Sequence, residues 1–121
     1  MPVSAGFRTF VLEQLEQTTR DLHARAMFGG VGIYAGDVFF ALIANDILYF
    51  KVDEKTRPNY TVLGMKPFRP YGEDGEAMKY FEVPVSVLED ADALRPWVAD
   101  AVAVARRAAQ TPRLGRKRTR S

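Results

Sequence analysis

Apolar residues near both ends of the chain recur every three or four positions, which predicts two amphipathic helices. The N-terminal stripe consists of Phe7, Phe10, Val11 and Leu15. Ser4 precedes it as a candidate N-cap, and the helix should end near Asp21, where the pattern weakens. The C-terminal stripe consists of Leu94, Trp97, Val98, Ala101, Val102, Ala105 and Ala109. Its helix should bury Trp97 in the core. The start is ambiguous, because Ser86 with Glu89 forms a capping-box pattern and Pro96 suits a first turn, so we expect a short turn before the main helix.

Between residues 25 and 53, short apolar runs alternate with turn residues, which predicts three consecutive antiparallel strands. Gly36 suits a tight turn that needs positive φ, and Asn45-Asp46 suits a two-residue hairpin loop. The run between these turns is apolar on both faces and should be the covered central strand. Two adjacent glycines in the first strand, Gly29 and Gly30, indicate a bulge or the close approach of another backbone.

The remaining elements should be a helix over 54–63, strands over 66–70 and 77–83, and the C-terminal helix. Tyr60 and Leu63 are the expected inner contacts of the short helix, and Gly64 is its expected stop. Two prolines in 66–70 lack backbone donors, which places that strand at an edge. We therefore expect one α+β domain over residues 1–110, in the order α-β-β-β-α-β-β-α, with a mainly antiparallel sheet and packed helices.

Several sequence segments, taken in order, resemble one bacterial family. They are Arg-x-Met-Phe-Gly-Gly-x-Gly-Ile-Tyr from Arg25, Phe-Ala-Leu-Ile from Phe40, Leu-Tyr-Phe-Lys-Val-Asp from Leu48, Met-Lys-Tyr-Phe-Glu-Val-Pro from Met78, and a later Trp97. From about Phe7 to Ala109, the chain resembles the N-terminal domain of the TfoX/Sxy family, known for regulators of natural competence. The resemblance implies the element order given above, grouped with secretion-chaperone-like folds. Full-length members carry a second, helical C-terminal domain, in whose place this chain has an eleven-residue basic tail, so the resemblance transfers the fold better than the regulatory role.

The composition predicts the cellular location of the protein and shows that its charge is distributed unevenly along the chain. The 121 residues include no cysteine and no apolar run near the ~20 residues that span a bilayer, so we expect a cytoplasmic protein without a membrane partner. The tail, 111–121, should be flexible, since it has one aliphatic residue. Its five cations are Arg113, Arg116, Lys117, Arg118 and Arg120. Subtracting these five leaves 12 basic against 15 acidic residues in positions 1–110, a net charge of −3. The tail is either solvated charge or a nonspecific contact for nucleic acid.

Motifs that carry chemistry are weak in this chain. Residues 30–35 match G-x-G-x-x-A, but another strand follows the match, so no helix N-terminus would face a pyrophosphate, and we expect no cofactor. His23 is the single histidine, and without cysteine it does not make a metal site. The acidic groups at 73–76 and 89–92 are explained by a solvated loop and a helix start. We therefore expect no catalytic residue, no metal and no enzymatic activity.

The best candidate site is a polar strand face. Tyr49 and Lys51 share one face of the strand before Asp53, and Arg57 follows in the next helix. Same-face residues lie ~7 Å apart, so one anionic ligand or partner carboxylate could touch several of these side chains. The alternative is a cross-strand ladder of charged and aromatic residues without a ligand.

These observations favour a non-enzymatic interaction module acting in gene regulation, as the family resemblance implies, with a protein partner and with the tail assisting on DNA. A chaperone-like or scaffold protein that binds a polypeptide, and a small-ligand sensor using the face of Tyr49, Lys51 and Asp53, are the alternatives. A homodimer is expected as well, because a second subunit could cover the apolar sheet face that the chain's own helices leave open.

Overall fold

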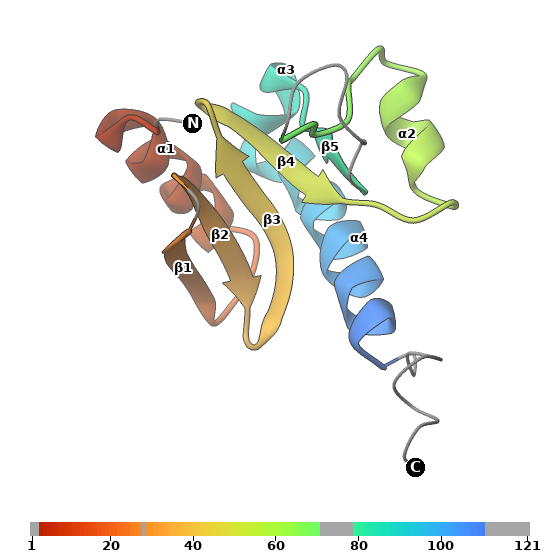
Figure 1. The fold of residues 1–121 in the computed structure, drawn as a ribbon, viewed down its shortest axis with the longest axis horizontal. Coiled ribbons are helices and arrows are strands. Elements are labelled where there is room, and N and C mark those ends of the chain that lie inside the picture. The colour runs from red at the N-terminus through yellow and green to blue at the C-terminus, as the bar shows by residue number, and fades with distance from the viewer. Residues whose placement is uncertain (1–2, 28, 71–78, 111–121) are drawn as a thin grey trace.

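A computed structural model describes residues 3–27, 29–70 and 79–110, and Figure 1 shows its elements. The helices are α1 (Ala5–Glu16), α2 (Arg57–Thr61), α3 (Val85–Leu88) and α4 (Ala91–Gln110). The strands are β1 (Leu22–Met27), β2 (Gly30–Ala35), β3 (Val38–Ala44), β4 (Ile47–Lys51) and β5 (Tyr80–Glu82). They form one sheet in the order β1-β2-β3-β4-β5, and every neighbouring pair is antiparallel. The α+β class and the central position of β3 are confirmed.

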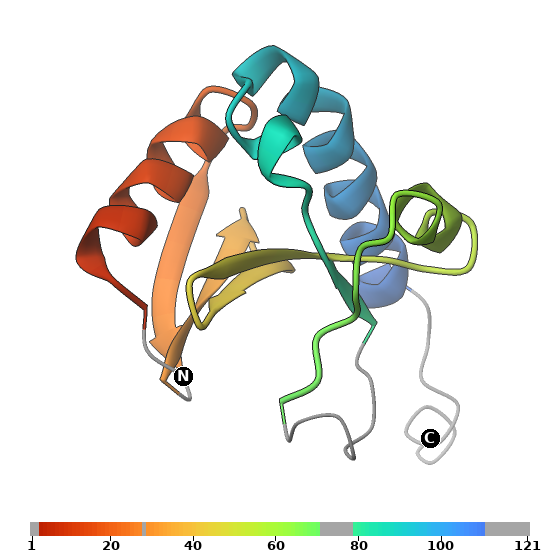
Figure 2. The same cartoon turned by 90° about the horizontal axis from the view of Figure 1, so that it is seen from above.

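The two long helices cover one face of the sheet, as Figure 2 shows. α4 packs against β3 and β4, and α1 packs against α4. Val11 and Leu15 of α1 and Leu94 of α4 are all fully buried in the core between the helices and the sheet. Ser4 caps α1 as predicted, because its hydroxyl oxygen accepts a hydrogen bond from the Phe7 amide at 3.2 Å. The helix ends at Glu16, slightly before the expected end near Asp21.

The prediction of three strands between residues 25 and 53 is wrong in number. The segment expected to be the first strand contains a chain reversal: Met27 pairs with Gly30, and Gly29 between them has a φ of 78°. The segment is therefore the β1–β2 hairpin, and Gly29 supplies the positive φ that its turn requires. The close approach expected at these glycines is present at Gly30, where an added Cβ would lie 2.5 Å from the carbonyl oxygen of Ile43.

The other two predicted turns are confirmed. Gly36, between β2 and β3, has a φ of 61°, and Asn45 and Asp46, between β3 and β4, both have a φ of 57°. Two consecutive positive φ values are typical of a type I′ hairpin turn, whose twist matches that of the flanking strands. The Asp46 carboxylate also accepts a hydrogen bond from the Ser4 amide at 2.7 Å, which ties this turn to the start of α1.

A β-bulge explains why two adjacent residues of β3 are both buried in the core. Ile33 pairs with Ala41 and Tyr34 pairs with Phe39, so Phe40 has no opposite residue in β2. The extra residue lets Phe40 and Ala41 both reach the core, where each is fully buried. Phe39 lies on the face away from the helices and stacks on Tyr34, with 5.1 Å between ring centroids.

The second half of the sheet is shorter than predicted. Residues 66–70 make no strand; Pro67 forms a single bridge with Phe81, because two prolines interrupt the donors that a strand needs. This segment nevertheless lines the outer edge of β5, where Phe68 donates to Tyr80 at 2.8 Å and Glu82 donates to Lys66 at 2.9 Å. β5 is the described part of the strand predicted over 77–83; residues 71–78, including the acidic loop, lie outside the described residues.

The short helix α2 has the expected stop but one misplaced side chain. Gly64 has a φ of 77°, and the Met65 amide bonds to the Tyr60 carbonyl at 3.0 Å, which together form a Schellman motif. Tyr60 is buried as expected. Leu63 was expected to face inward, but its side chain is 52% exposed. The five helical residues of α2 are too few for periodicity to specify an inner face.

The C-terminal stripe forms the inner face of α4, and the short turn expected before the main helix is confirmed as α3. The main helix itself begins at Ala91, between the two starting points that the sequence suggested. α3 precedes it as a separate turn, and the Asp90 carboxylate caps α4 by accepting from the Asp92 amide at 3.0 Å. Pro96 lies inside the helix. Trp97 was expected in the core, but it packs at the margin of the core and is only half-buried.

Candidate functional site

The alternation predicted for β4 is confirmed, and it separates the core residues from the candidate ones. Leu48 and Phe50 belong to the core under the helices. Tyr49 and Lys51 therefore project from the opposite face, since successive side chains of a strand alternate. Their immediate neighbours differ: the Tyr49 ring lies 5.0 Å from the ring of Phe68, whereas the Lys51 ammonium lies 5.0 Å from the ring centroid of Tyr80.

The phenol groups of Tyr49 in β4 and Tyr80 in β5 are both protonated. Burial, and secondarily the Glu82 carboxylate opposite Tyr49 in β5, raise the pKa of Tyr49. Burial also raises the pKa of Tyr80 to about 12, with a smaller contribution from Tyr34. Both phenols stay neutral at physiological pH, so they offer hydrogen bonds and ring surface rather than charge.

Asp53 lies just beyond the end of β4 and is held in place by two kinds of contact. Its carboxylate accepts the Lys55 and Thr56 amides at 3.0 Å each, while the Thr56 hydroxyl accepts the Asp53 amide at 3.1 Å. The same carboxylate accepts a hydrogen bond of 2.7 Å from the guanidinium of Arg107 in α4. The Arg107 hydrogen bond is the main reason that the pKa of Asp53 falls to about 2. Asp53 is thus an ionised anchor for Arg107.

Around this ion pair opens a cavity of about 780 Å³, which we name the basic pocket. Its lining charges are those of Lys51, Arg57, Lys79, Arg107, Asp53 and Glu54, four cations against two carboxylates. Its apolar lining is Val52, Pro67, Phe81, Val104 and Ala108. The structure therefore brings Lys51, Asp53 and Arg57 of the predicted site around one cavity, and it places Tyr49 outside that lining.

Arg107 is the member of the pocket that strand spacing did not indicate. It lies on the polar face of a helix 54 residues after Asp53, and only the packing of α4 on the sheet brings it to the end of β4. Lys79, just before β5, belongs to the pocket for a similar reason, because β5 pairs with β4. Strand pairing and helix packing, which are long-range contacts, complete the site.

The arrangement is suited to binding an anionic group. Guanidinium and ammonium groups donate to carboxylate or phosphate oxygens, and the apolar walls strengthen such contacts by excluding water. Within the described residues, no group of three or more His, Asp or Glu side chains could hold a metal ion. His23 lies elsewhere, in β1, where its ring nitrogen is 2.9 Å from the exposed carboxylate of Asp21.

The five cations of the tail, Arg113, Arg116, Lys117, Arg118 and Arg120, lie outside the described residues. In the part of the chain that the structure does describe, no helix is long and apolar enough to cross a membrane.

One protein-family model matches most of this chain. The family model described as the TfoX N-terminal domain matches residues 13–105. The match begins within α1, covers all five strands and ends within α4, two residues before Arg107. A comparison with curated proteins gave no match. The matched family is not known as enzymatic. Because the match covers most of the 121 residues, the chain belongs to the TfoX N-terminal domain family.

Proposed function

We propose that this domain is a non-enzymatic regulatory module that acts by binding an acidic segment of a partner protein in the basic pocket. Membership of the TfoX N-terminal domain family supports a regulatory or competence-related role. The observation that carries the proposal is the convergence of four cationic side chains from β4, α2, α4 and the residue before β5 around one cavity.

The charge balance determines which class of ligand the pocket prefers. Asp53 pairs with Arg107, and Glu54 is the second lining carboxylate, so the lining retains a net charge of +2. Like charges that converge on one site repel one another, and an anion that enters the site relieves this repulsion. Carboxylates of a partner protein supply that charge, and the apolar walls provide contact for the stems of their side chains.

A small anionic metabolite is the second candidate ligand, which would make the domain a sensor. The cavity of about 780 Å³ lies in the usual size range of small-molecule sites, roughly 300–1,000 Å³. The two candidates share the same cations and differ in the size of the bound group. An acidic peptide and inorganic phosphate, used as separate probes, distinguish them.

The test uses charge reversal at Arg57 and Lys79, two exposed cations of the lining, and leaves Arg107 with its partner Asp53. A labelled hexaglutamate peptide should bind the unmodified chain, and the variant R57E/K79E should lose this binding. The control R20E/R106E makes the same change of net charge at exposed positions outside the pocket lining, and it should retain binding. Equal loss in both variants would mean that only overall charge matters, and the pocket would then not be the site.

The same pair of variants tests the regulatory part of the proposal. In affinity purification from the native host, the proposed partner should be captured by the unmodified chain and by R20E/R106E, but not by R57E/K79E. Binding of inorganic phosphate without any protein captured in this pattern would favour the sensor. Reproducible turnover in a broad substrate screen, abolished by Lys51→Met, would overturn the non-enzymatic assignment.

A further inference from the structure

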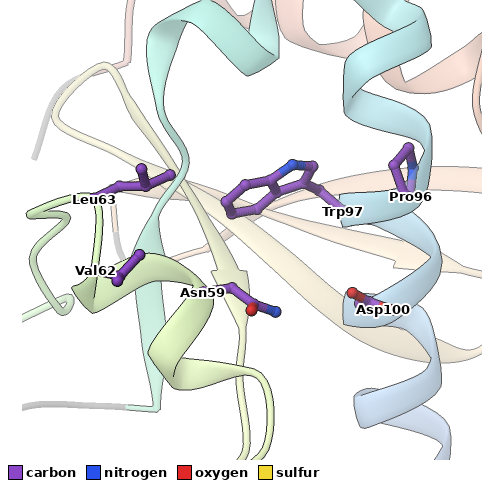
Figure 3. A pocket seen from close by; sticks show the side chains of 6 residues that line it. All are labelled: Asn59, Val62, Leu63, Pro96, Trp97 and Asp100. Carbon is purple, nitrogen blue, oxygen red and sulfur yellow. The ribbon is translucent and has the colours of Figure 1, made fainter.

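A second cavity lies between α2 and α4 and shares no lining residue with the basic pocket; Figure 3 shows its lining. Its volume is about 310 Å³, and the lining residues are Asn59, Val62, Leu63, Pro96, Trp97 and Asp100. The side chains of Trp97 and Leu63 point from opposite walls into the space between the helices. We name this cavity the helix groove.

The apolar wall on α2 has no role in the core. Val62 is 78% exposed and Leu63 is 52% exposed, and neither belongs to the core cluster. Trp97 is half-buried, and its ring meets the ring of buried Tyr60 edge-on at 4.8 Å between centroids, so the floor of the groove is rigid and aromatic. Adjacent large apolar side chains that flank a preformed cavity are typical of a surface that another segment covers.

The charge at the groove is acidic. Asp100 is the one ionisable residue among the six that line it, whereas Asp92, earlier in α4, is paired with Arg95 at 3.7 Å. Within the described part of the chain, the side-chain carboxylate of Asp100 takes part in no hydrogen bond or ion pair. An occupant that fits this surface combines a large apolar side chain with neighbouring cations.

We propose that the helix groove binds residues 112–120 of a second copy of this chain. In the sequence Pro-Arg-Leu-Gly-Arg-Lys-Arg-Thr-Arg, one leucine, Leu114, is surrounded by five cations, which matches an apolar groove that contains the carboxylate of Asp100. The aliphatic stems of the arginines can lie along Val62 and Pro96 while their guanidinium groups reach Asp100. This inference is independent of the basic pocket and of its proposed ligand.

The number of residues between the end of α4 and Leu114 indicates whether the tail in the groove comes from the same molecule or from a second copy. α4 ends at Gln110, and Trp97 lies 13 residues earlier in the same helix, which places the groove roughly 20 Å from the helix end at 1.5 Å per residue. Leu114 follows Gln110 by four residues, which span at most about 14 Å when fully extended. Leu114 therefore falls short of Trp97 in its own chain by roughly 6 Å along the helix axis, whereas two copies can exchange their tails reciprocally.

The experiment has a built-in reporter, because Trp97 is the only tryptophan of the chain and lines the groove. The full-length variant Leu114→Asp should sediment as a monomer at concentrations where the unmodified chain self-associates. A synthetic peptide of residues 111–121 should then shift the Trp97 emission of that variant, and a peptide carrying Leu114→Asp should not. No shift with the unmodified peptide would overturn the proposal.

Two valines provide matched variants for the groove itself. Val62 in the groove is 78% exposed, and Val85 in α3, away from the groove, is 61% exposed. Val62→Ser should weaken self-association at least about threefold, because it removes apolar contact with the leucine, and Val85→Ser should leave self-association unchanged. Equal effects of the two substitutions, or continued self-association of the Leu114→Asp variant, would show that another surface or segment joins the copies and would contradict the proposal.

Discussion

Arg107, in the last turns of α4, donates a hydrogen bond of 2.7 Å to Asp53, which lies 54 residues earlier at the end of β4. The pair fastens the end of the longest helix to the sheet and at the same time forms one wall of the basic pocket. Both side chains are partly exposed, by 55% and 33%, so solvent weakens the interaction without removing it. Stability and binding are thus connected at one ion pair.

The pair should make folding stability depend on acid pH. The pKa of Asp53 falls from 3.8 to about 2 in the folded chain, so the unfolded chain binds the proton more readily. The ionised carboxylate therefore contributes stability above about pH 4, and this contribution is lost as the pH falls towards 2. Asp53→Asn should lower the free energy of unfolding at pH 7 by ~1 kcal/mol, a value reduced for the exposure of the pair.

Urea denaturation at pH 7 and at pH 2 to 3 measures this effect. Asparagine keeps an oxygen that can cap the Lys55 and Thr56 amides, so the substitution removes the charge and the hydrogen bond from Arg107 while leaving the capping in place. Asp37→Asn, at an exposed turn position between β2 and β3, is the control and should change stability by less than ~0.5 kcal/mol. A deficit of Asp53→Asn that stays the same at both pH values would contradict the assignment to ionised Asp53.

Glycine substitutions should have opposite effects at two positions. Gly30→Ala should destabilise the fold by more than ~2 kcal/mol, because its Cβ would collide with the backbone of Ile43 in the neighbouring strand. Gly6→Ala, in α1, has no atom within 4 Å of the new Cβ and should raise stability by up to ~1 kcal/mol. Thermal unfolding followed by circular dichroism measures both. A tolerated Gly30→Ala would mean that β2 and β3 pack less closely than described.

Leu94 and Trp97 lie in the same stripe of α4 but should differ in their contributions. Leu94 is fully buried, and Leu94→Ala should cost ~2–5 kcal/mol. Trp97 is half-buried, so Trp97→Ala should cost ~2 kcal/mol, roughly half of the usual cost of removing a buried aromatic ring. Circular dichroism is the suitable probe, since the Trp97 substitution removes the only tryptophan. A loss below ~1 kcal/mol for Trp97→Ala would place its ring on the surface.

The five tail cations should make binding to duplex DNA depend on salt. If Arg113, Arg116, Lys117, Arg118 and Arg120 all contact phosphates, the logarithm of the binding constant should fall against the logarithm of salt with a slope near −4.5, about −0.9 per contact. Binding should be weak and indifferent to sequence, because phosphate contacts do not read bases. Fluorescence anisotropy in a salt titration measures the slope.

The control for this prediction replaces all five tail cations with glutamine in the full chain. That variant should lose the slope and keep the fold, because the core lies within residues 11–105. If it bound DNA as tightly as the unmodified chain, the contact would have to lie on the folded body. Lys51, Arg57 and Lys79 would then be the first positions to substitute.

Local features of the sequence predicted those parts of the fold that depend on local chemistry. Positive φ at Gly36 and at Asn45-Asp46, the cap at Ser4 and the apolar stripe of α4 all follow from residues close together in the chain. The β1–β2 turn escaped prediction because an apolar run that contains two glycines fits a bulged strand as well as a hairpin. The exposed position of Leu63 depends on the turn after α2, which periodicity does not describe.

The candidate site could be predicted only in part, because some of its contacts join residues that are far apart in the sequence. Lys51, Asp53 and Arg57 are near neighbours in sequence, and strand spacing was enough to group them. Tyr49 shares the face of Lys51, but its ring packs on Phe68 instead of lining the pocket, and that contact depends on the path of residues 66–68 along β5. Arg107 enters through helix packing across more than 50 residues. No pattern within a short window contains that information.

The packing of α4 on β3 and β4 also sets the order of events while the chain is being synthesised. β1 to β4 are neighbours in both sequence and sheet, so they can pair as successive hairpins as soon as they leave the ribosome. Phe40 and Phe50, which α4 helps to bury, stay uncovered until residues 91–105 have been translated. During that interval the nascent sheet exposes its apolar face, and it is then that the chain most needs protection from aggregation.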